Sequence, residues 1–221
     1  MVYPNYKGTP NECDFQFFHT PFKEITIIDH IAMTSTETST GTGTSTGTST
    51  FQCSEIIPGK LFLGVKKFAQ NQKLLKTKEI SAIVNLTEVP LFFSYDSSEQ
   101  IPVHWVPIKD TEDQGIEWIE DAAIFIDSQL KANKRVFVHC VMGISRSPTL
   151  IIYYLMTRNS NSLECMNLRE ALEFVLSKRS IIRPNNGFIK ALIDFEKTHR
   201  GSSSMTEDEY GKFMKPLRIQ P

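Results

Sequence analysis

From residue 55 onward, short apolar runs alternate with longer stretches in which apolar residues recur at helical spacing. The short runs contain β-branched and aromatic side chains and end at turn residues, so they are predicted to be strands. These predicted strands lie within residues 56–64, 80–86, 104–108 and 135–138. The predicted helices lie within residues 65–77, 116–131, 168–176 and 188–195, and a further helix begins just after Arg146, where Pro148 suits a first helical turn and residues 150–156 are apolar.

Strands that alternate with helices predict an α/β fold with a central, mostly parallel sheet flanked by helices. In such a sheet, ligands bind at the carboxyl ends of the strands. The helix 116–131 has one apolar face and leads back to the strand 135–138, which we place at the centre of the domain.

The chain divides by composition into a folded domain and flanking segments. Residues 1–33 are a leader without clear periodicity, in which Ile25–Ile28 is either a short strand or unstructured. Residues 34–54 are expected to form a low-complexity Thr/Ser/Gly linker, because the threonine tract from Thr34 to Thr50 has no apolar surface to offset the entropy of ordering. The folded domain is expected at residues 55–198, and residues 199–221 are expected to be a disordered tail.

Composition narrows the functional class. The chain of 221 residues has a formal charge of −1, so no charge imbalance points to nucleic acid as a partner. The cysteines, Cys13, Cys53, Cys140 and Cys165, show no disulfide framework spacing. The chain has no apolar signal core or run long enough to span a membrane, and we expect a cytoplasmic protein, with the nucleus as an alternative.

The stretch Arg135–Thr149 combines a strand, a tight loop and a helix start around one cysteine and one arginine. Cys140 lies where the strand ends. Gly143 lies where the backbone needs a positive φ, and the amide N–H groups of the loop can curl around an anion. The stretch therefore predicts a phosphate cradle directed at a thiol.

The position of Cys140 predicts a reactive thiolate. The helix N-terminus, the loop amides and Arg146 all favour the ionised thiol, and such sites lower a cysteine pKa from about 8.5 to about 3.5–7.5. Cys140 would attack the phosphorus of a phosphomonoester and form a phosphocysteine. Arg146 offers a planar fork for two phosphoryl oxygens, and the hydroxyl of Ser147 can stabilise the departing thiolate.

The string His139-Cys140-Val-Met-Gly143-Ile-Ser145-Arg146-Ser147 resembles the Cys-x5-Arg signature of protein tyrosine phosphatases, in the form found in dual-specificity phosphatases. A buried structural cysteine would leave Gly143, Arg146 and the serines unexplained. A zinc site would need a second ligand at suitable spacing beyond His139, which we interpret as an orienting residue rather than a base. The substrate phosphate is expected to bind residues of the loop, namely Val141, Met142, Gly143, Ile144, Ser145 and Arg146.

The resemblance also suggests a general acid. In the resembled family, an aspartate directly after the strand 104–108 protonates the leaving oxygen and later activates the water that hydrolyses the phosphocysteine. Asp110 holds that position, and Glu112 and Asp113 are competitors in the same loop. Further along, Arg183–Phe188 resembles the family's closing element, in which Asn185 either steadies the active-site loops or caps a helix.

The resemblance covers residues 55–198 and implies a small, atypical dual-specificity phosphatase that needs no metal or other cofactor. It implies a phosphoprotein substrate carrying phosphotyrosine and phosphoserine or phosphothreonine, with a protein kinase as a candidate partner. Lys215–Ile219 is similar to kinase docking peptides, although a frayed tail is the favoured interpretation. The alternatives are a phosphoinositide or phosphoglucan phosphatase, and a phosphopeptide-binding module without activity. The apolar Val141, Met142 and Ile144 weaken the inositide alternative.

Overall fold

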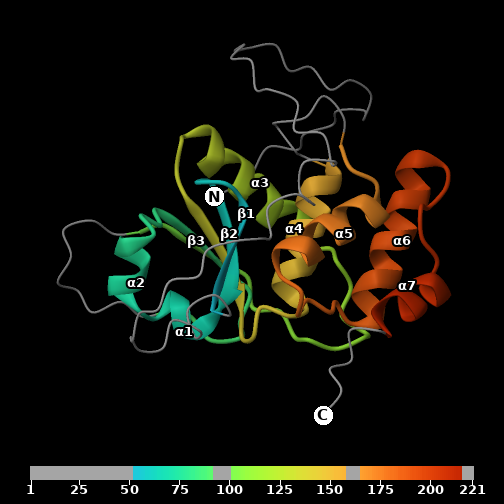
Figure 1. Ribbon diagram of the computed structural model, residues 1–221, viewed down its shortest axis with the longest axis horizontal. Helices are drawn as coiled ribbons and strands as arrows, with labels where there is room; N and C mark the ends of the chain where they lie inside the picture. Colours follow the sequence, from blue (N-terminus) through green and yellow to red (C-terminus); the bar gives the residue numbers. More distant parts are fainter. Residues whose placement is uncertain (1–51, 92–100, 158–164, 216–221) are drawn as a thin grey trace, which may run out of the picture. The chain divides into compact units, whose positions relative to one another are not determined.

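A five-stranded sheet in the order β1-β2-β5-β3-β4 forms the centre of the fold (Figure 1). The computed structural model describes residues 52–91, 101–157 and 165–215. Strand β1 is antiparallel to β2, whereas β2, β5, β3 and β4 run parallel to one another, which confirms the expected mostly parallel sheet. The strands are β1 (Cys53–Ile57), β2 (Leu61–Val65), β3 (Ala82–Asn85), β4 (Val103–Trp105) and β5 (Val136–Cys140).

The helices cover both faces of this sheet, as Figure 1 shows for α1 and α2 on one side and for α4, α5 and α6 on the other. Side chains along each strand alternate between the two faces. Phe62, Ile83 and Phe137 belong to the smaller core under α1 and α2, and their neighbours along the strands belong to the larger core. The helices are α1 (Lys66–Ala69), α2 (Gln72–Thr77), α3 (Ile119–Lys131), α4 (Arg146–Thr157), α5 (Leu168–Lys178), α6 (Asn186–Arg200) and α7 (Glu207–Met214).

Strand β5 is enclosed on both edges and is fully buried. It pairs with β2 on one side and with β3 on the other, and all five of its residues are buried. Helix α4 follows it and is buried from Arg146 to Met156, as the apolar run in the sequence predicts. The loop between β5 and α4 is therefore held at both ends by the rigid centre of the domain.

Helix α7 corrects our expectation of a disordered tail over residues 199–221. Thr206 and Glu209 form a capping box at the start of α7, and the helix buries Tyr210 and Met214 in the larger core. The apolar residues are few but fall on one face, which suffices because α6 supplies the surface they cover. The structure describes the tail only as far as Lys215, so the docking-like segment 215–219 lies almost wholly outside the described residues.

Other boundaries differ in smaller ways. The expected single helix over 65–77 is divided into α1 and α2, because the side chain of Asn71 accepts the N–H of Leu74 and starts a new helix. Strand β1 begins at Cys53, just inside the expected linker. The leader and the linker up to residue 51 lie outside the described residues, as does Ile25–Ile28. No helix among the described residues is long and apolar enough to cross a bilayer.

Glu196 is a buried carboxylate that ties α6 to the start of α5 and to the loop before α7. Its side chain is 1% exposed. Its oxygens accept the N–H of Leu168 at 2.8 Å and the N–H of Ser204 at 2.7 Å. The hydroxyl of Ser203 donates to the same carboxylate at 2.8 Å. Burial raises the pKa of Glu196, but these donors outweigh it and hold the pKa below its usual value.

We expect Glu196→Ala to lower the free energy of unfolding by about 2–4 kcal/mol near neutral pH, because buried donors lose a charged acceptor. The folded pKa lies below the unfolded one, so this stabilisation is present above the unfolded pKa and is lost as the pH falls through the folded pKa. Urea unfolding at neutral and acidic pH measures the difference. The control is Glu173→Gln on the exposed face of α5. Equal stability of Glu196→Ala and wild type at neutral pH would contradict this role.

Candidate active site

The loop from Cys140 to Arg146 connects the carboxyl end of β5 to the N-terminus of α4. Gly143 has a φ of +65°, and a Cβ there would lie 2.6 Å from the carbonyl oxygen of Gly64. Only glycine accepts both the backbone conformation and this close approach. The loop can therefore fold tightly back over the thiol of Cys140.

Hydrogen-bond donors surround the thiol. The N–H of Gly143 and the hydroxyl of Ser147 both lie 3.2 Å from Sγ of Cys140. Burial raises the pKa of Cys140, but the hydroxyl and N–H of Ser147, the charge of Arg146 and the N–H of Ile144 together outweigh it and lower the pKa below its ordinary value. The predicted nucleophile is thus surrounded by the groups that a thiolate needs.

His139 directly precedes Cys140 on β5 and is fully buried. Burial lowers its pKa to about 4, so the ring is neutral near pH 7. Its Nδ1 lies 3.1 Å from the carbonyl oxygen of Cys140. A neutral ring bonded to the loop backbone fits the predicted orienting role better than that of a base.

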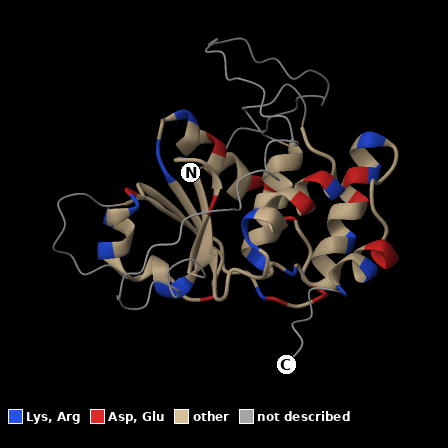
Figure 2. Ribbon diagram, viewed as in Figure 1, with Lys and Arg blue, Asp and Glu red and all other residues tan. Residues whose placement is uncertain are grey.

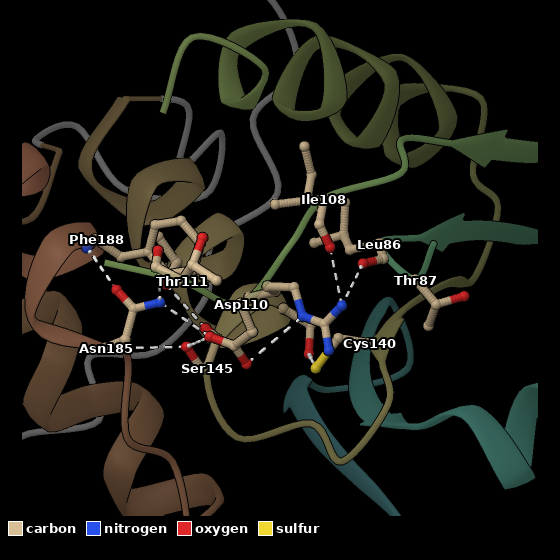
Figure 3. Close-up of polar contacts among 12 residues, drawn as sticks. Leu86, Thr87, Ile108, Asp110, Thr111, Cys140, Ser145, Asn185 and Phe188 are labelled. Carbon is tan, nitrogen blue, oxygen red and sulfur yellow. Dashed lines mark hydrogen bonds and ion pairs between the residues drawn. The ribbon is translucent and has the colours of Figure 1, made fainter. Parts of the chain in front are cut away.

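Backbone carbonyls outside the loop hold the guanidinium of Arg146 in place. Its Nη1 donates to the carbonyl oxygen of Ile108 at 2.9 Å and lies 3.4 Å from that of Leu86 (Figure 3). Its Nε is buried without a hydrogen-bond partner in the described part of the chain, and lies 3.6 Å from Oδ2 of Asp110. An anion in the loop would satisfy this buried donor.

Asp110 lies beside the loop, where Ser145 and Asn185 flank it (Figure 3). Its Oδ1 accepts the hydroxyl of Ser145 at 2.6 Å and the side-chain amide of Asn185 at 2.9 Å. Of its two competitors, Glu112 instead accepts the side-chain amide of Asn186 at 2.9 Å. Asp113 instead interacts with Thr111, whose hydroxyl together with a backbone N–H lowers the pKa of Asp113. The geometry therefore favours Asp110.

Asn185 fills both of the roles that the sequence left open. Its side chain accepts the N–H of Phe188 at 2.9 Å and so caps α6. Its amide nitrogen donates to Asp110, and its backbone N–H donates to the hydroxyl of Ser145 at 3.1 Å. One residue thus fixes the start of a helix and the position of the candidate acid.

The remaining predicted substrate-binding residues line the outer edge of the loop. Val141 is 45% exposed and Met142 is 58% exposed, which is unusual for such side chains in this protein. Ile144 is half-buried, and its carbonyl oxygen accepts the N–H of Arg183. Apolar side chains therefore form the rim around the polar floor of the site.

Two contributors went undetected in the sequence. Arg179 contacts the loop from the end of α5, and Tyr210 of α7 donates to the carbonyl oxygen of Pro184 at 2.6 Å, directly before Asn185. Both act on backbone carbonyls, which leave no trace in residue type or spacing.

Cys53 is poorly placed to pair with Cys140. It faces Gly64 of β2, which in turn faces His139 of β5, so two strand spacings of about 4.8 Å each separate Cys53 from β5. A disulfide needs Cα atoms within about 7 Å. Burial also raises the pKa of the Cys53 thiol to about 12. Cys53, Cys140 and Cys165 are all free thiols.

The described residues contain no group of three His, Cys, Asp or Glu side chains arranged to hold a metal ion. The site instead consists of a thiol, a guanidinium and inward-pointing amides, which together suit a tetrahedral oxyanion.

Comparison with known proteins gives consistent matches. A family model described as dual specificity phosphatase, catalytic domain, matches residues 61–198. Dual specificity protein phosphatase 1-A of Xenopus laevis is 38% identical over 148 residues, which cover 64% of this chain but only 36% of that relative. Dual specificity protein phosphatase 14 of Mus musculus is 36% identical over 159 residues, which cover 70% of this chain and 76% of the relative.

Solved structures agree with these matches. The crystal structure of human tyrosine phosphatase-like serine/threonine/tyrosine-interacting protein has a TM-score of 0.58 and 28% identity, over 68% of this chain and 99% of that one. The Yvh1 phosphatase domain from Chaetomium thermophilum has a TM-score of 0.56 and 30% identity, over 65% of this chain and 94% of that one.

The contrast between Cys140 and Cys53 predicts selective alkylation. At mildly acidic pH, iodoacetamide should label Cys140 while Cys53 stays unmodified, because only the pKa of Cys140 is lowered. Labelling of Cys140 should fall as the pH drops through its own pKa. Peptide mapping by mass spectrometry measures both rates in one sample. Equal rates for Cys53 and Cys140 would contradict the electrostatic description of the site.

Proposed function

The chain belongs to the dual specificity phosphatase family, and we propose that it is an active enzyme that hydrolyses phosphotyrosine and phosphoserine or phosphothreonine in proteins. The observation that carries the proposal is the convergence of Cys140, Arg146 and Asp110 on one loop. Cys140 is held among donors, Arg146 keeps a buried donor available, and Asp110 lies beside them. This arrangement supports a two-step displacement at phosphorus.

In the first step, Sγ of Cys140 attacks phosphorus and the bond from phosphorus to the substrate oxygen breaks. Arg146 and the loop amides hold the non-bridging oxygens, where charge is concentrated in the transition state. Asp110 delivers a proton to the departing oxygen, which leaves as a neutral alcohol or phenol. The product of this step is a phosphocysteine and a dephosphorylated side chain.

In the second step, the carboxylate of Asp110 takes a proton from water, and the water oxygen attacks phosphorus. The bond from phosphorus to Sγ breaks, inorganic phosphate forms, and the thiolate returns. Ser147 lies 3.2 Å from Sγ and its hydroxyl stabilises the thiolate as it leaves. The cycle restores Asp110 to its protonated form.

The surroundings of the loop support an anionic substrate. Every charged residue between positions 56 and 78 is a lysine, and Figure 2 shows these basic residues along α1 and α2. Lys66, the first residue of α1, donates its N–H to the carbonyl oxygen of Val141 at 3.1 Å. The start of α1 therefore adjoins the catalytic loop, and the positive charge of this lysine-rich segment favours a phosphorylated ligand.

We expect the wild-type protein to release phosphate from both positions of a peptide phosphorylated on threonine and tyrosine, with chelator present. Cys140→Ser should lower the rate to less than about a thousandth while retaining peptide binding, because serine is not ionised near pH 7. Cys53→Ser is the matched control and should retain activity. Phosphate release and peptide binding are measured on the same preparations.

Other outcomes of that experiment would replace the proposal. Tight peptide binding without any release would indicate a binding module. Phosphoinositides and phosphoglucans are assayed in parallel. If phosphate is released from only one of these classes, that class is the substrate.

Asp110→Asn tests the acid. We expect a loss of about 10²- to 10⁴-fold with an alkyl phosphate, whose leaving group needs a proton, and a much smaller loss with an aryl phosphate that has a good leaving group. Glu112→Gln serves as the matched control in the same loop and should leave both rates near wild type. If Glu112→Gln reproduced the leaving-group dependence and Asp110→Asn did not, the acid would be Glu112.

A further inference from the structure

Arg179 is the C-cap residue of α5, and its side chain turns back toward the catalytic loop. The residue is 3% exposed. Its Nε donates to the carbonyl oxygen of Gly143 at 2.8 Å, and its Nη2 donates to the carbonyl oxygen of Met142 at 3.1 Å. The guanidinium thus forms hydrogen bonds to two consecutive carbonyl groups of the loop, on the side opposite the thiol.

A third contact holds the guanidinium itself in place. Its Nη1 donates to the hydroxyl of Ser54 on β1 at 3.3 Å, and the backbone N–H of Arg179 donates to the carbonyl oxygen of Val175 at 2.9 Å. The side chain is therefore fixed between helix α5, strand β1 and the loop. A planar fork can make these separate bonds at once, whereas an ammonium group is a single point charge.

Peptide planarity converts these outward bonds into inward ones. The carbonyl of one residue and the N–H of the next belong to one rigid unit and point in opposite directions. A carbonyl of Met142 held outward therefore directs the N–H of Gly143 inward, and that N–H lies 3.2 Å from Sγ of Cys140. A carbonyl of Gly143 held outward likewise directs inward the N–H of Ile144, which also lowers the pKa of Cys140.

We propose that Arg179 is a positioning residue of the active site, which fixes the carbonyls of Met142 and Gly143 and so aims two amides at the thiolate and at the bound phosphate. Its effect on the thiol follows from the loop geometry, and its effect on phosphate rests on the function proposed above. Such a clamp matters at Gly143, because a residue without a Cβ has more backbone conformations open to it than any other residue type.

The electrostatics agree with this geometry. Burial lowers the pKa of Arg179, and the nearby Cys140 and Cys53 offset only part of this shift. The interaction is mutual, so the charge of Arg179 also favours the ionised thiol. Arg179 therefore supports Cys140 both through the amides that it orients and through its own charge.

The test is the pH dependence of Cys140 alkylation by iodoacetamide in wild type, Arg179→Met and Arg179→Lys. Arg179→Met should raise the midpoint by about one pH unit, which leaves about tenfold less thiolate at lower pH. Arg179→Lys, which keeps the charge but loses the fork, should fall between the two. Mass spectrometry of the Cys140 peptide excludes signal from the other cysteines. Steady-state kinetics on a phosphopeptide should show a parallel loss in kcat/KM.

Lys178→Met is the matched control, because it removes the same charge from the neighbouring residue. Lys178 is exposed and lies over the ring of Phe174 at 5.5 Å, away from the loop carbonyls. An unchanged midpoint in Arg179→Met, or an equal shift in Lys178→Met, would overturn the proposal. If Arg179→Met does not fold, the midpoint of Cys140 alkylation in Arg179→Lys is compared with that of wild type instead. An unchanged midpoint would then overturn the proposal. If Cys140 of the wild-type protein is alkylated as expected but the protein releases no phosphate, only the proposed function is rejected.

Discussion

A thiolate buried at the end of a central strand is unfavourable unless donors surround it, and the fold around Cys140 supplies them. Burial alone raises the pKa of this thiol, yet the net shift is downward. The amides of the loop do this only if its carbonyls point away, and each of those carbonyls needs a partner of its own. Each carbonyl from Cys140 to Ser145 has one. The carbonyl of Cys140 meets the ring of His139, and that of Val141 accepts the N–H of Lys66. The carbonyls of Met142 and Gly143 accept Nη2 and Nε of Arg179, that of Ile144 accepts the N–H of Arg183, and that of Ser145 accepts the N–H and hydroxyl of Thr149.

This arrangement explains why distant parts of the chain meet at one loop. Helices α1 and α5 and the segment before α6 each satisfy part of its outer side, and β2 approaches so closely that only glycine fits at position 143. The inner side is then free for an anion. Arg146 is held in a similar way: its Nη1 donates to backbone carbonyls, whereas its Nε stays available for an anion. Much of the support for the loop therefore comes from residues outside the signature, which donate hydrogen bonds to the loop carbonyls.

The sequence predicts features that are encoded in contiguous residues, and it misses features that depend on contacts between distant segments. The central strand, the buried helix and the loop with Cys140 and Arg146 are encoded in contiguous residues, so periodicity and motif identify them. Arg179 could not be singled out, because its partners are carbonyl oxygens that every residue carries. Helix α7 was missed for a different reason: its capping residues Thr206 and Glu209 are visible, but its short apolar face only makes sense once α6 is in place. Boundaries such as the break at Asn71 depend on a single cap.

The candidate acid is tied to the nucleophile through Ser145. Its hydroxyl donates to Asp110 and accepts the N–H of Asn185, so the loop, the candidate acid and the start of α6 meet at one hydroxyl group. Asn185 follows Pro184, whose carbonyl oxygen accepts the hydroxyl of Tyr210 from α7. The family match ends at residue 198, yet this chain of contacts continues beyond it. Since Tyr210 is buried and its hydroxyl bonds the backbone just before Asn185, the contacts that support the candidate site extend to α7, beyond the residues that the family model matches.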